Sequence, residues 1–524
     1  MIPKQNNKVP PEIVQQLIKD ALQDPQLPRQ NPTEAFWQLP AAEHAKAQSA
    51  KLSSVTTYAI IGSGITGCSV AKNLLDNLPA DSNSTVTVFE ARSLTSGATG
   101  RNGGHILSPV PEEFGAMSKG FGATEAAKIG RFANRTLESM HGLAATEGLT
   151  EAAQVRHVRT ITGFRDEKLL DEAKKSFLKY EECVQEAQGD GQVLTSEEAT
   201  QEYNLKDTVG AISCSAGAFW PYRLVTGIFA RMLSQYDGRF FLETETPVTA
   251  VAYQPEEDRD HPYSIDTARG TVHATKVIYC SNGWTGHLIP NLRGKIFPLR
   301  GTMSVQKAGS ELPSQGDQRS WSMIDKPQYN NQDSTFSYGL YYITQDPMTG
   351  DVFIGGEKQR IGEVLSSDDT TTSSVSQKTL ENILPTIFAK GWRDGEVPEV
   401  KKLWSGVMGF TPDHLPWVGQ IPKDVTGRAG DGEFIAAGFN GYGMPLCWGC
   451  GEAVAKMILG KEAEVSEWLP ASFLVSSKRL NSVFTTPEAA VAGLLGQLPD
   501  WLTTAKLVGR HAVNLVRGAL FRWM

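Results

Sequence analysis

The stretch TYAIIGSGITGCSVAKNLL, residues 57–75, decides the fold of this chain. Three glycines, Gly62, Gly64 and Gly67, stand between an apolar run and apolar residues that recur at helical spacing. The spacing G-x-G-x-x-G also occurs by chance, so its meaning depends on the structure that flanks it. Here the run over 59–61 predicts a buried parallel strand before the glycines, and the later residues predict a helix after them.

A second apolar run, residues 86–89, ends at Glu90 and completes a β-α-β unit. In dinucleotide-binding units an acidic residue about twenty positions beyond the glycines binds the ribose hydroxyls, and the pyrophosphate lies at the helix N-terminus. A glycine-rich turn that binds nothing is the alternative. The matching strand, helix and distal acid predict a dinucleotide site, although the motif alone does not identify the dinucleotide.

Length and composition favour a two-domain enzyme. The chain has 524 residues, whereas single hydrophobic cores stop growing at about 250 to 300 residues. A hydrophobic fraction of 40% is sufficient to build two cores. The formal net charge of -8, without a dominant basic stripe, argues against a nucleic-acid partner and favours a small-molecule substrate.

The sequence indicates a reducing compartment. The N-terminal residues show no apolar signal-peptide core, and we find no apolar run of about twenty residues. The six cysteines show no framework spacing, which favours the cytoplasm, with the peroxisome left open. Cys447 and Cys450 have the spacing of a redox motif or half a zinc site, but no second pair accompanies them, so we expect buried thiols and no metal.

Several segments lie outside the predicted core. Two helical patterns, 11–23 and 41–52, are expected to wrap the surface, 254–262 is expected to form an exposed hairpin turn, and 365–377 a mobile loop. Residues 503–524 predict an amphipathic helix that packs on the domain, joins a dimer or lies on an anionic membrane. Its polar face comprises Lys506, Arg510, Asn514 and Arg517, opposite Leu507, Leu515, Ala519 and Trp523.

Two glycine-rich segments favour a flavin over a nicotinamide. The segment ARSLTSGATGRNGGH, residues 91–105, would let backbone N–H groups pass close to a flat ring and its phosphate arm. A nicotinamide domain would enter another β-α unit at this point. Residues 434–460 read as a strand, a glycine turn and a helix whose N-terminus could face the N1 and C2 carbonyl edge of a reduced flavin.

The sequence resembles the FAD-dependent oxidoreductase family of the D-amino-acid-oxidase type, which comprises amine and amino-acid oxidases. The resemblance covers roughly residues 56–462, and the SGATGRNGG loop is similar to the branch that contains gamma-glutamylputrescine oxidase. It rests on four ordered blocks: AIIGSGITGCSVAKNL, FEARSLTSGATGRNGGH, KVIYCSNGWTGHLIPNLRGKIFPLRGTM and LWSGVMGFTPDHLPWVGQIP with FIAAGFNGYGMP.

The resemblance implies a mixed α/β fold, with a Rossmann-like FAD-binding domain and a discontinuous substrate domain built on an antiparallel sheet. The implied division has an N-terminal extension at 1–54 and a C-terminal helical extension at 463–524. Between them lie a FAD-binding domain, 55–105, 206–290 and 400–462, and a substrate domain, 106–205 and 291–399.

The resemblance also assigns cofactor contacts to this chain. The residues expected to bind the pyrophosphate and the ribose are Gly62, Ser63, Gly64, Ile65, Thr66, Gly67, Glu90, Ala91 and Arg92. The residues expected beside the isoalloxazine and the ribityl arm are Gly100, Arg101, Asn102, Gly103, Gly104 and His105. The Val248 backbone is expected to contact the adenine. A second set of residues near the pyrophosphate comprises Ser281, Asn282, Gly283 and Trp284. The residues expected to contact the flavin pyrimidine are Asn440, Gly441, Tyr442, Gly443 and Met444.

The implied reaction oxidises a C–N bond: a hydride passes to flavin N5, the imine hydrolyses, and oxygen reoxidises the flavin to give hydrogen peroxide. No obligatory side-chain base is implied, so the catalytic candidates are His105 and Arg300. His105 either tethers the flavin or hydrogen-bonds beneath the ring; a cysteine tether is excluded because residues 336–356 hold no cysteine. Arg300 either meets a carboxylate or the flavin, or is an exposed arginine at a sheet edge.

Other side chains have weaker assignments. Asp413, before His414, is expected to cap the turn that precedes the flavin. Of Tyr341 and Tyr342, one should face the pocket and the other the core, because neighbours on a strand alternate. Trp220 and Trp404 are expected in the core, with an aromatic wall for a cationic amine as the alternative.

Two alternative functions stay open. A dehydrogenase with a quinone or protein acceptor would keep the fold, and peroxide production under air would distinguish it from an oxidase. A flavin-binding protein without turnover would hold flavin that no amine reduces. The expected partners are a small-molecule amine or amino acid and molecular oxygen, with membrane contact through the C-terminal helix left open.

Overall fold

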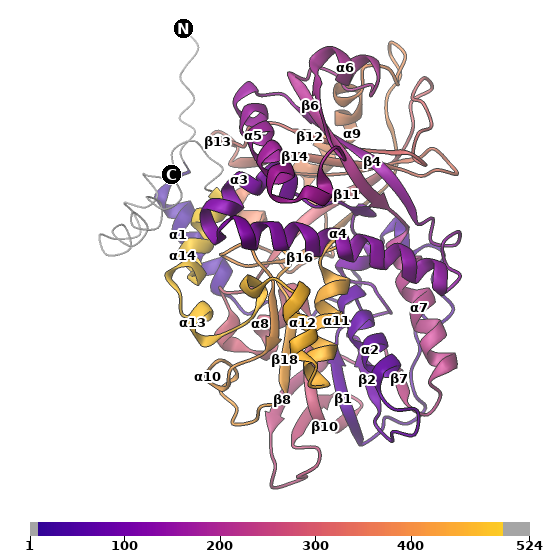
Figure 1. Cartoon of the computed structure of the whole chain (residues 1–524), viewed down its shortest axis with the longest axis vertical. Helices are drawn as coiled ribbons and strands as arrows, with labels where there is room; N and C mark the ends of the chain where they lie inside the picture. The colour runs from indigo at the N-terminus through magenta and orange to yellow at the C-terminus, as the bar shows by residue number, and fades with distance from the viewer. Residues whose placement is uncertain (1–8, 496–524) are drawn as a thin grey trace.

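The computed structural model describes residues 9–495. Within that range two β-sheets lie one above the other along the long axis of the molecule, and α4 (Ala123–Thr146) crosses at the level where they meet (Figure 1). The lower sheet carries the glycine motif. The upper sheet, with its helices, covers the side at which the lower strands end.

The lower sheet is built on parallel strands. Within the described residues it has eight strands in the order β17-β18-β10-β1-β2-β7, with β9 and β8 added beside β10. The five strands from β18 to β7 run parallel, so their carboxyl ends meet at one edge. Their bounds are β1 Val55–Ile61, β2 Val86–Phe89, β7 Phe240–Glu243, β8 Val248–Tyr253, β9 Tyr263–Thr267, β10 Gly270–Tyr279, β17 Trp417–Gln420 and β18 Glu433–Ala437.

The predicted β-α-β unit is confirmed. Strand β1 leads through the glycines into α2 (Ile65–Asn77), and β2 returns parallel to β1. Helix α2 packs against α11 (Cys447–Ile458), where Ser69 Oγ donates to the Trp448 carbonyl at 2.6 Å. Tyr58 and Ile60 of β1 are buried in one cluster with the apolar residues of α2, which fixes the helix over that face of the sheet, whereas Ala59 and Ile61 belong to a second cluster.

The upper sheet has ten strands within the described residues, in the order β16-β11-β15-β14-β12-β4-β6-β3, with β13 beside β14 and β5 beside β6. Its pairs are antiparallel as expected, except that β12 and β4 run parallel. The bounds are β3 His105–Ile106, β4 Arg156–Phe164, β5 Gln192–Thr195, β6 Gly210–Ala218, β11 Phe297–Lys307, β12 Arg319–Ile324, β13 Gln328–Asn330, β14 Thr335–Gln345, β15 Val352–Arg360 and β16 Glu399–Phe410.

The two sheets draw on interleaved parts of the chain, as a discontinuous layout requires. Strands β6 and β16, which the predicted division assigns to the FAD-binding domain, pair within the upper sheet. The exact domain boundaries stay a prediction. The predicted hairpin at 254–262 is confirmed as the antiparallel connection between β8 and β9.

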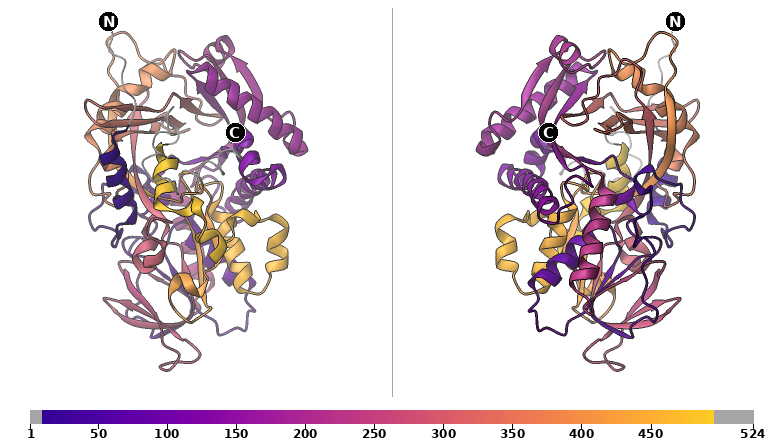
Figure 2. Two further views of the ribbon diagram at one scale, coloured as in Figure 1. Left: turned by 90° about the vertical axis from the view of Figure 1, so that its left-hand side faces the viewer. Right: turned by 90° about the vertical axis from the view of Figure 1, so that its right-hand side faces the viewer.

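Helices surround both sheets. Helices α3 and α5 pack on each other, and the magenta helices of the upper half lie opposite its orange strands (Figure 2). Their bounds, with those of the remaining α-helices, are α1 Pro11–Leu22, α3 Val110–Phe121, α5 Glu167–Cys183, α6 Ser196–Gln201, α7 Pro221–Gln235, α8 Thr285–Leu288, α9 Ser374–Ile387, α10 Lys423–Thr426, α12 Glu462–Trp468, α13 Ser477–Leu480 and α14 Pro487–Leu495.

The N-terminal extension enters the interior. Helix α1 confirms the first helical pattern and packs against α14 through Leu17 and Leu494. The helix expected over 41–52 is wrong, because that segment holds only a turn. Its Ala45 carbonyl instead accepts from the Leu94 N–H at 2.8 Å, so the backbone is bonded to the segment after β2.

The helix predicted over 503–524 lies outside the described residues. Within 9–495 we find no helix with the length and apolar character needed to cross a bilayer.

Candidate active site

The glycine loop shows where a cofactor can approach the backbone. A Cβ on Gly62, whose φ is +114°, would lie 2.6 Å from the Cys280 carbonyl oxygen, and one on Gly67 would lie 2.0 Å from the Gly62 oxygen. Close packing therefore demands both glycines. A Cβ on Gly64 would meet only the Thr99 hydroxyl, at 3.1 Å, so Gly64 leaves its backbone bare beside the cavity described below.

Glu90, at the end of β2, lies directly beneath this loop. Its carboxylate accepts from the Ser63 hydroxyl at 2.6 Å and from the Arg92 N–H at 2.9 Å. The strand thus fixes a buried carboxylate next to the N-terminus of α2, where a ribose would lie beside a pyrophosphate.

A cavity of about 1430 Å³ extends from the glycine loop to the upper sheet. Ordinary small-molecule pockets measure about 300–1000 Å³, so this one has room for a dinucleotide and a substrate. The predicted cofactor residues that line it are Gly62, Ser63, Gly64, Ile65, Thr66, Glu90, Ala91, Arg92, Arg101, Asn102, Gly103, His105, Val248, Ser281, Asn282, Trp284, Asn440, Gly441, Tyr442, Gly443 and Met444.

Four predicted glycines do not line the cavity: Gly67, Gly100, Gly104 and Gly283. Each faces packed chain instead. A Cβ would lie 2.4 Å from the Thr95 oxygen at Gly100 and 2.6 Å from the Phe219 oxygen at Gly104. These glycines therefore shape the loops around the cavity, and their predicted contacts with the cofactor stay predictions.

The segment 101–104, which we expect beside the isoalloxazine, is held by its carbonyl groups. Each of its four carbonyls accepts a hydrogen bond from a different part of the chain. The donors, in order from 101 to 104, are Trp404 Nε1 at 2.8 Å, Trp37 Nε1, Thr344 Oγ1 at 2.8 Å and the Phe219 N–H at 3.0 Å. This fixes the path of the loop before any ligand binds.

The aromatic donors correct one expectation and confirm another. Trp404 and Trp220 pack in the core as predicted. Trp37 belongs to the extension that was expected to wrap the surface, yet it is 4% exposed and stacks on Phe353. This role could not be read from the sequence, because Trp37 lies in a Pro- and Gln-rich segment.

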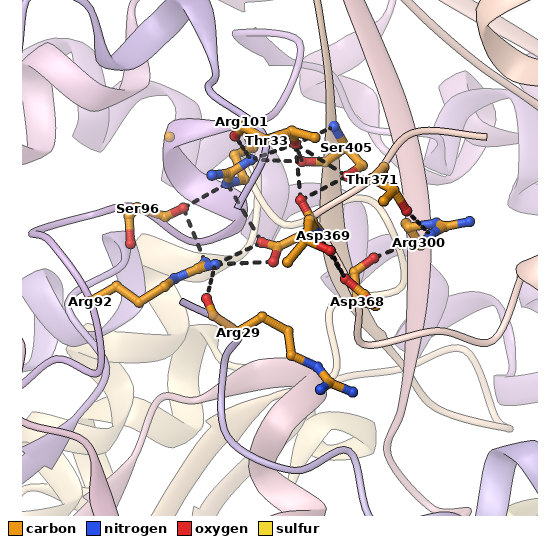
Figure 3. A network of polar contacts seen from close by, with 12 residues as sticks. Arg29, Thr33, Arg92, Ser96, Arg101, Arg300, Asp368, Asp369, Thr371 and Ser405 are labelled. Atoms are coloured by element: carbon orange, nitrogen blue, oxygen red, sulfur yellow. Dashed lines mark hydrogen bonds and ion pairs between the residues drawn. The ribbon is translucent and has the colours of Figure 1, made fainter. Parts of the chain in front are cut away.

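A buried ionic network lies beside this loop (Figure 3). The Asp369 carboxylate, with no exposed surface, lies 2.9 Å from Arg92 Nη1 and 3.8 Å from Arg101 Nε. Arg101 also donates to the Ser96 carbonyl at 2.7 Å. Burial lowers the pKa of Arg101 to about 10, against the pull of Asp369, so it stays protonated at neutral pH. Two guanidinium groups thus share one carboxylate.

Asp369 lies in the segment expected to be a mobile loop, and that expectation is wrong for its centre. The Asp369 carbonyl accepts from the Thr33 N–H at 2.7 Å and from the Ser405 hydroxyl at 3.2 Å. The segment is therefore bonded to the N-terminal extension and to β16.

Arg300 does not enter the cavity. Its strand neighbours Leu299 and Gly301 line it, so the intervening side chain points to the other face of β11. There Arg300 donates to the Asp368 carbonyl at 3.3 Å (Figure 3). Its role toward substrate or flavin stays a prediction that this direction does not favour, and the alternative of an exposed arginine at a sheet edge is wrong because Arg300 is buried and β11 lies between β16 and β15.

His105, the other catalytic candidate, faces the cavity. Its Nε2 lies 2.8 Å from Ser320 Oγ. Burial, reinforced by the Arg156 cation, lowers the pKa of His105 from 6.5 to about 4, so the imidazole is neutral at physiological pH. A covalent link to flavin through His105 stays a prediction, with a hydrogen-bonded residue beneath the ring as its alternative.

The turn 440–444 meets the loop 101–104 from the other side. Asn102 Nδ2 donates to Met444 Sδ at 3.1 Å, which brings together the two segments expected to contact the flavin ring. Asn440, with φ +54°, accepts from the Thr411 N–H at 2.8 Å and donates to the Gly438 carbonyl at 2.8 Å. The turn is thereby fixed before the start of α11.

The remaining assignments are resolved by packing. Tyr342 lines the cavity and Tyr341 packs in the core of the upper sheet, as alternation predicts. Asp413 accepts from the Leu415 N–H and pairs with Arg479 at 2.8 Å, so it does cap the local turn.

The cysteines are also resolved by packing. Cys447 and Cys450 are buried free thiols, and burial raises the pKa of both. Within 9–495, no three metal-ligating side chains cluster.

Glu112 and Glu113 are among the cavity residues that were not predicted. They line the cavity from the first turn of α3. Acidic residues at the start of a helix ordinarily complement its dipole, so their positions in the sequence do not single them out.

Comparisons with known proteins agree with the geometry. The model of the family described as FAD dependent oxidoreductase matches residues 57–457. The probable oxidoreductase OrdL of Rhizobium meliloti is 25% identical over 431 residues, which cover 78% of this chain and 84% of that protein. The gamma-glutamylputrescine oxidoreductase of Escherichia coli is 22% identical over 476 residues, 89% and 99% of the two chains.

Solved structures share the fold. Glycine oxidase from Geobacillus kaustophilus superposes with a TM-score of 0.60 at 19% identity, covering 81% of this chain and 99% of that chain.

Proposed function

The chain belongs to the family of FAD-dependent oxidoreductases that act on amines and amino acids, and from this membership we propose the reaction that it carries out. The proposed reaction oxidises the C–N bond of an amine or amino acid to an imine, which water then hydrolyses. Bound FAD would supply the acceptor, taking a hydride at N5 and passing the electrons to oxygen to give hydrogen peroxide.

The observation that supports this proposal is the single cavity. It joins the glycine loop, Glu90, the loop 101–104 and the turn 440–444, which come from distant parts of the sequence. We propose that Gly62, Gly64 and residues 281–284 hold the pyrophosphate and that Glu90 holds the adenosine ribose. Val248 would face the adenine, while the loop and the turn would enclose the isoalloxazine.

The residues of the chain would perform three tasks. The bonded loop 101–104 positions the ring, because its four carbonyls are already engaged. Arg92 and Arg101 leave one positive charge uncompensated by Asp369, which favours an anionic cofactor beside them. The buried surroundings of the cavity favour the neutral form of the substrate amine that must lose the hydride.

An anaerobic titration tests the proposal. Purified holoenzyme is mixed with polyamines, N-methyl amino acids, and D- and L-amino acids, while the visible flavin band is followed. Bleaching of the flavin band by one of these classes of compound supports the oxidation of an amine or amino acid. A flavin band that no compound bleaches would contradict it and would favour a flavin-binding protein without turnover.

The electron acceptor needs its own measurement. Peroxide formed in air in proportion to the substrate consumed supports oxygen as acceptor. Bleaching without peroxide, with turnover restored by a quinone, would make the protein a dehydrogenase. We place the enzyme in the cytoplasm within the same proposal, on the cysteine pattern.

A further inference from the structure

The cavity continues past the segments proposed to hold FAD. Its far region is bounded by α3, α5 and one face of the upper sheet. Glu112 and Glu113 both line this region; the Glu112 residue is half-buried and the Glu113 residue is exposed. Among the described residues no basic side chain acts on the pKa of either carboxyl group. The two carboxyl groups therefore share a confined space without a counter-charge of their own.

Confinement affects the charge of both groups. Burial raises the pKa of Glu112 and of Glu113 from 4.5 to about 7; the Thr162 hydroxyl opposes this for Glu112, and the Glu113 charge adds to it. Burial also raises the pKa of Tyr442, and the charges of Glu113 and Glu112 raise it further. Burial raises the pKa of the Cys214 thiol, and the charge of Glu112 adds to this increase. A cation placed here would be attracted by both carboxylates at once.

Lysines at the cavity are engaged elsewhere or lie apart. Lys168 pairs with Glu172 at 3.7 Å, and Lys326 pairs with Asp166. The other lysines that line the cavity are Lys119, Lys175 and Lys179. Among the described residues none of the five forms an ion pair with Glu112 or Glu113, so the acidic pair has no lysine of the cavity as a direct partner.

Two hydroxyl groups give an independent indication of a ligand. Thr162 on β4 and Ser322 on β12 are partners across the parallel pair, are only 1% and 3% exposed, and line the cavity. The Ser322 hydroxyl has no hydrogen-bond partner in the described structure, whereas the Thr162 hydroxyl already acts on the Glu112 carboxyl group. Buried polar groups are normally satisfied, so the unpaired Ser322 hydroxyl favours a hydrogen-bonding ligand beside Thr162 and Glu112.

Among the described residues no arginine lines this far region of the cavity. The arginines that line the cavity within 9–495 are Arg92 and Arg101, and both are bound to Asp369 at the FAD end. Arg300 points away from it. An ammonium group has three donors and no acceptor, and it matches a site made of carboxylate and hydroxyl oxygens.

We propose that Glu112 and Glu113, assisted by Thr162 and Ser322, bind a second ammonium group of the substrate that does not react, which makes the substrate a diamine or polyamine. This inference rests on the proposed amine oxidation. Tyr442 connects the two ends of the cavity: it belongs to the turn proposed to meet the flavin, and its pKa responds to both glutamates. One end of a diamine would thus lie at the flavin while the other reaches α3.

The test compares holoenzyme with 1,4-diaminobutane, spermidine and butylamine. The variant is Glu112→Gln with Glu113→Gln, and the matched control is Glu172→Gln, a carboxylate on the same cavity wall that pairs with Lys168. Binding is measured anaerobically by perturbation of the flavin spectrum, and the bleaching rate is followed separately.

The wild-type protein should bind the diamines about 10- to 100-fold more tightly than butylamine, as charged hydrogen bonds allow. The double variant should lose this preference, while Glu172→Gln keeps it. Equal affinity for diamines and butylamine, or a preference that survives in the double variant, would overturn the inference alone. Absence of bleaching with every amine and amino acid would instead overturn the proposed function.

Discussion

Arg92 Nη1 lies 2.9 and 3.0 Å from the two carboxylate oxygens of Asp369, although 277 residues separate them in sequence. The pair is buried, and Asp369 also binds the N-terminal extension and β16 through its backbone carbonyl. This contact joins three distant segments beside the loop 101–104, so it stabilises the surroundings of the flavin before the cofactor arrives.

Replacement of Asp369 should be strongly destabilising. Asp369→Asn leaves the Arg92 guanidinium buried without its charge partner, and breaking a buried ion pair costs about 3–5 kcal/mol. Denaturant unfolding of the apoprotein measures this loss. The neighbouring Asp368→Asn, whose side chain only caps the local turn, should cost no more than about 1 kcal/mol. Equal effects of the two variants would show that the ion pair adds no stability.

Two glycine variants should separate cofactor binding from folding. Gly64→Ala can be accommodated by a small shift of Thr99, so the apoprotein should fold normally while its Kd for FAD rises about tenfold or more. Gly67→Ala would place its Cβ 2.0 Å from the Gly62 oxygen and should prevent folding. Circular dichroism and FAD titration distinguish the two outcomes. Normal FAD affinity in Gly64→Ala would argue against a pyrophosphate beside it.

Trp37→Phe should loosen the flavin loop. It removes the donor to the Asn102 carbonyl, and an unpaired buried carbonyl costs about 1–3 kcal/mol. The matched control is Trp321→Phe, since the Nε1 of Trp321 is buried without a partner in the described structure. Both variants lose ring volume in a packed core, so thermal unfolding should show a larger decrease in Tm for Trp37→Phe than for the control. A similar Tm decrease in both variants would mean that ring size, not the hydrogen bond, matters.

The acidic pair should impose a pH dependence on stability. Because the pKa of Glu112 and Glu113 is raised from 4.5 to about 7, the folded protein retains protons that the unfolded chain has lost. Their contribution therefore becomes less favourable as pH rises from 4.5 through 7. The double Gln variant should melt at the same temperature as wild type at pH 5 and at a higher temperature at pH 8. A variant equally stable relative to wild type at both pH values would contradict the raised pKa.

Local patterns predicted the part of the fold that carries the cofactor. The strand, glycine turn, helix and acid of residues 57–90 form one continuous unit, so periodicity and spacing were enough. Contacts between distant segments could not be read in this way. The Asp369 segment has the Ser- and Thr-rich composition of a solvent loop, and only its pairing with Arg92 reveals a buried carboxylate.

Side-chain direction was the other limit. Strand alternation predicted that Tyr341 and Tyr342 face opposite sides, but not which side holds the cavity. The same ambiguity placed Arg300 among the catalytic candidates, whereas the structure turns it to the opposite face of β11. The position of Glu112 and Glu113 in the cavity could not be predicted for a similar reason, because acidic residues in the first turn of a helix are ordinarily explained by the helix dipole.

The most direct test of the whole account is an anaerobic absorbance spectrum of the purified protein, recorded before and after addition of 1,4-diaminobutane. We expect a bound flavin whose visible band is bleached by the diamine. A protein that shows no flavin band, and acquires none when FAD is added, would contradict the cofactor assignment on which the reaction and the substrate both depend.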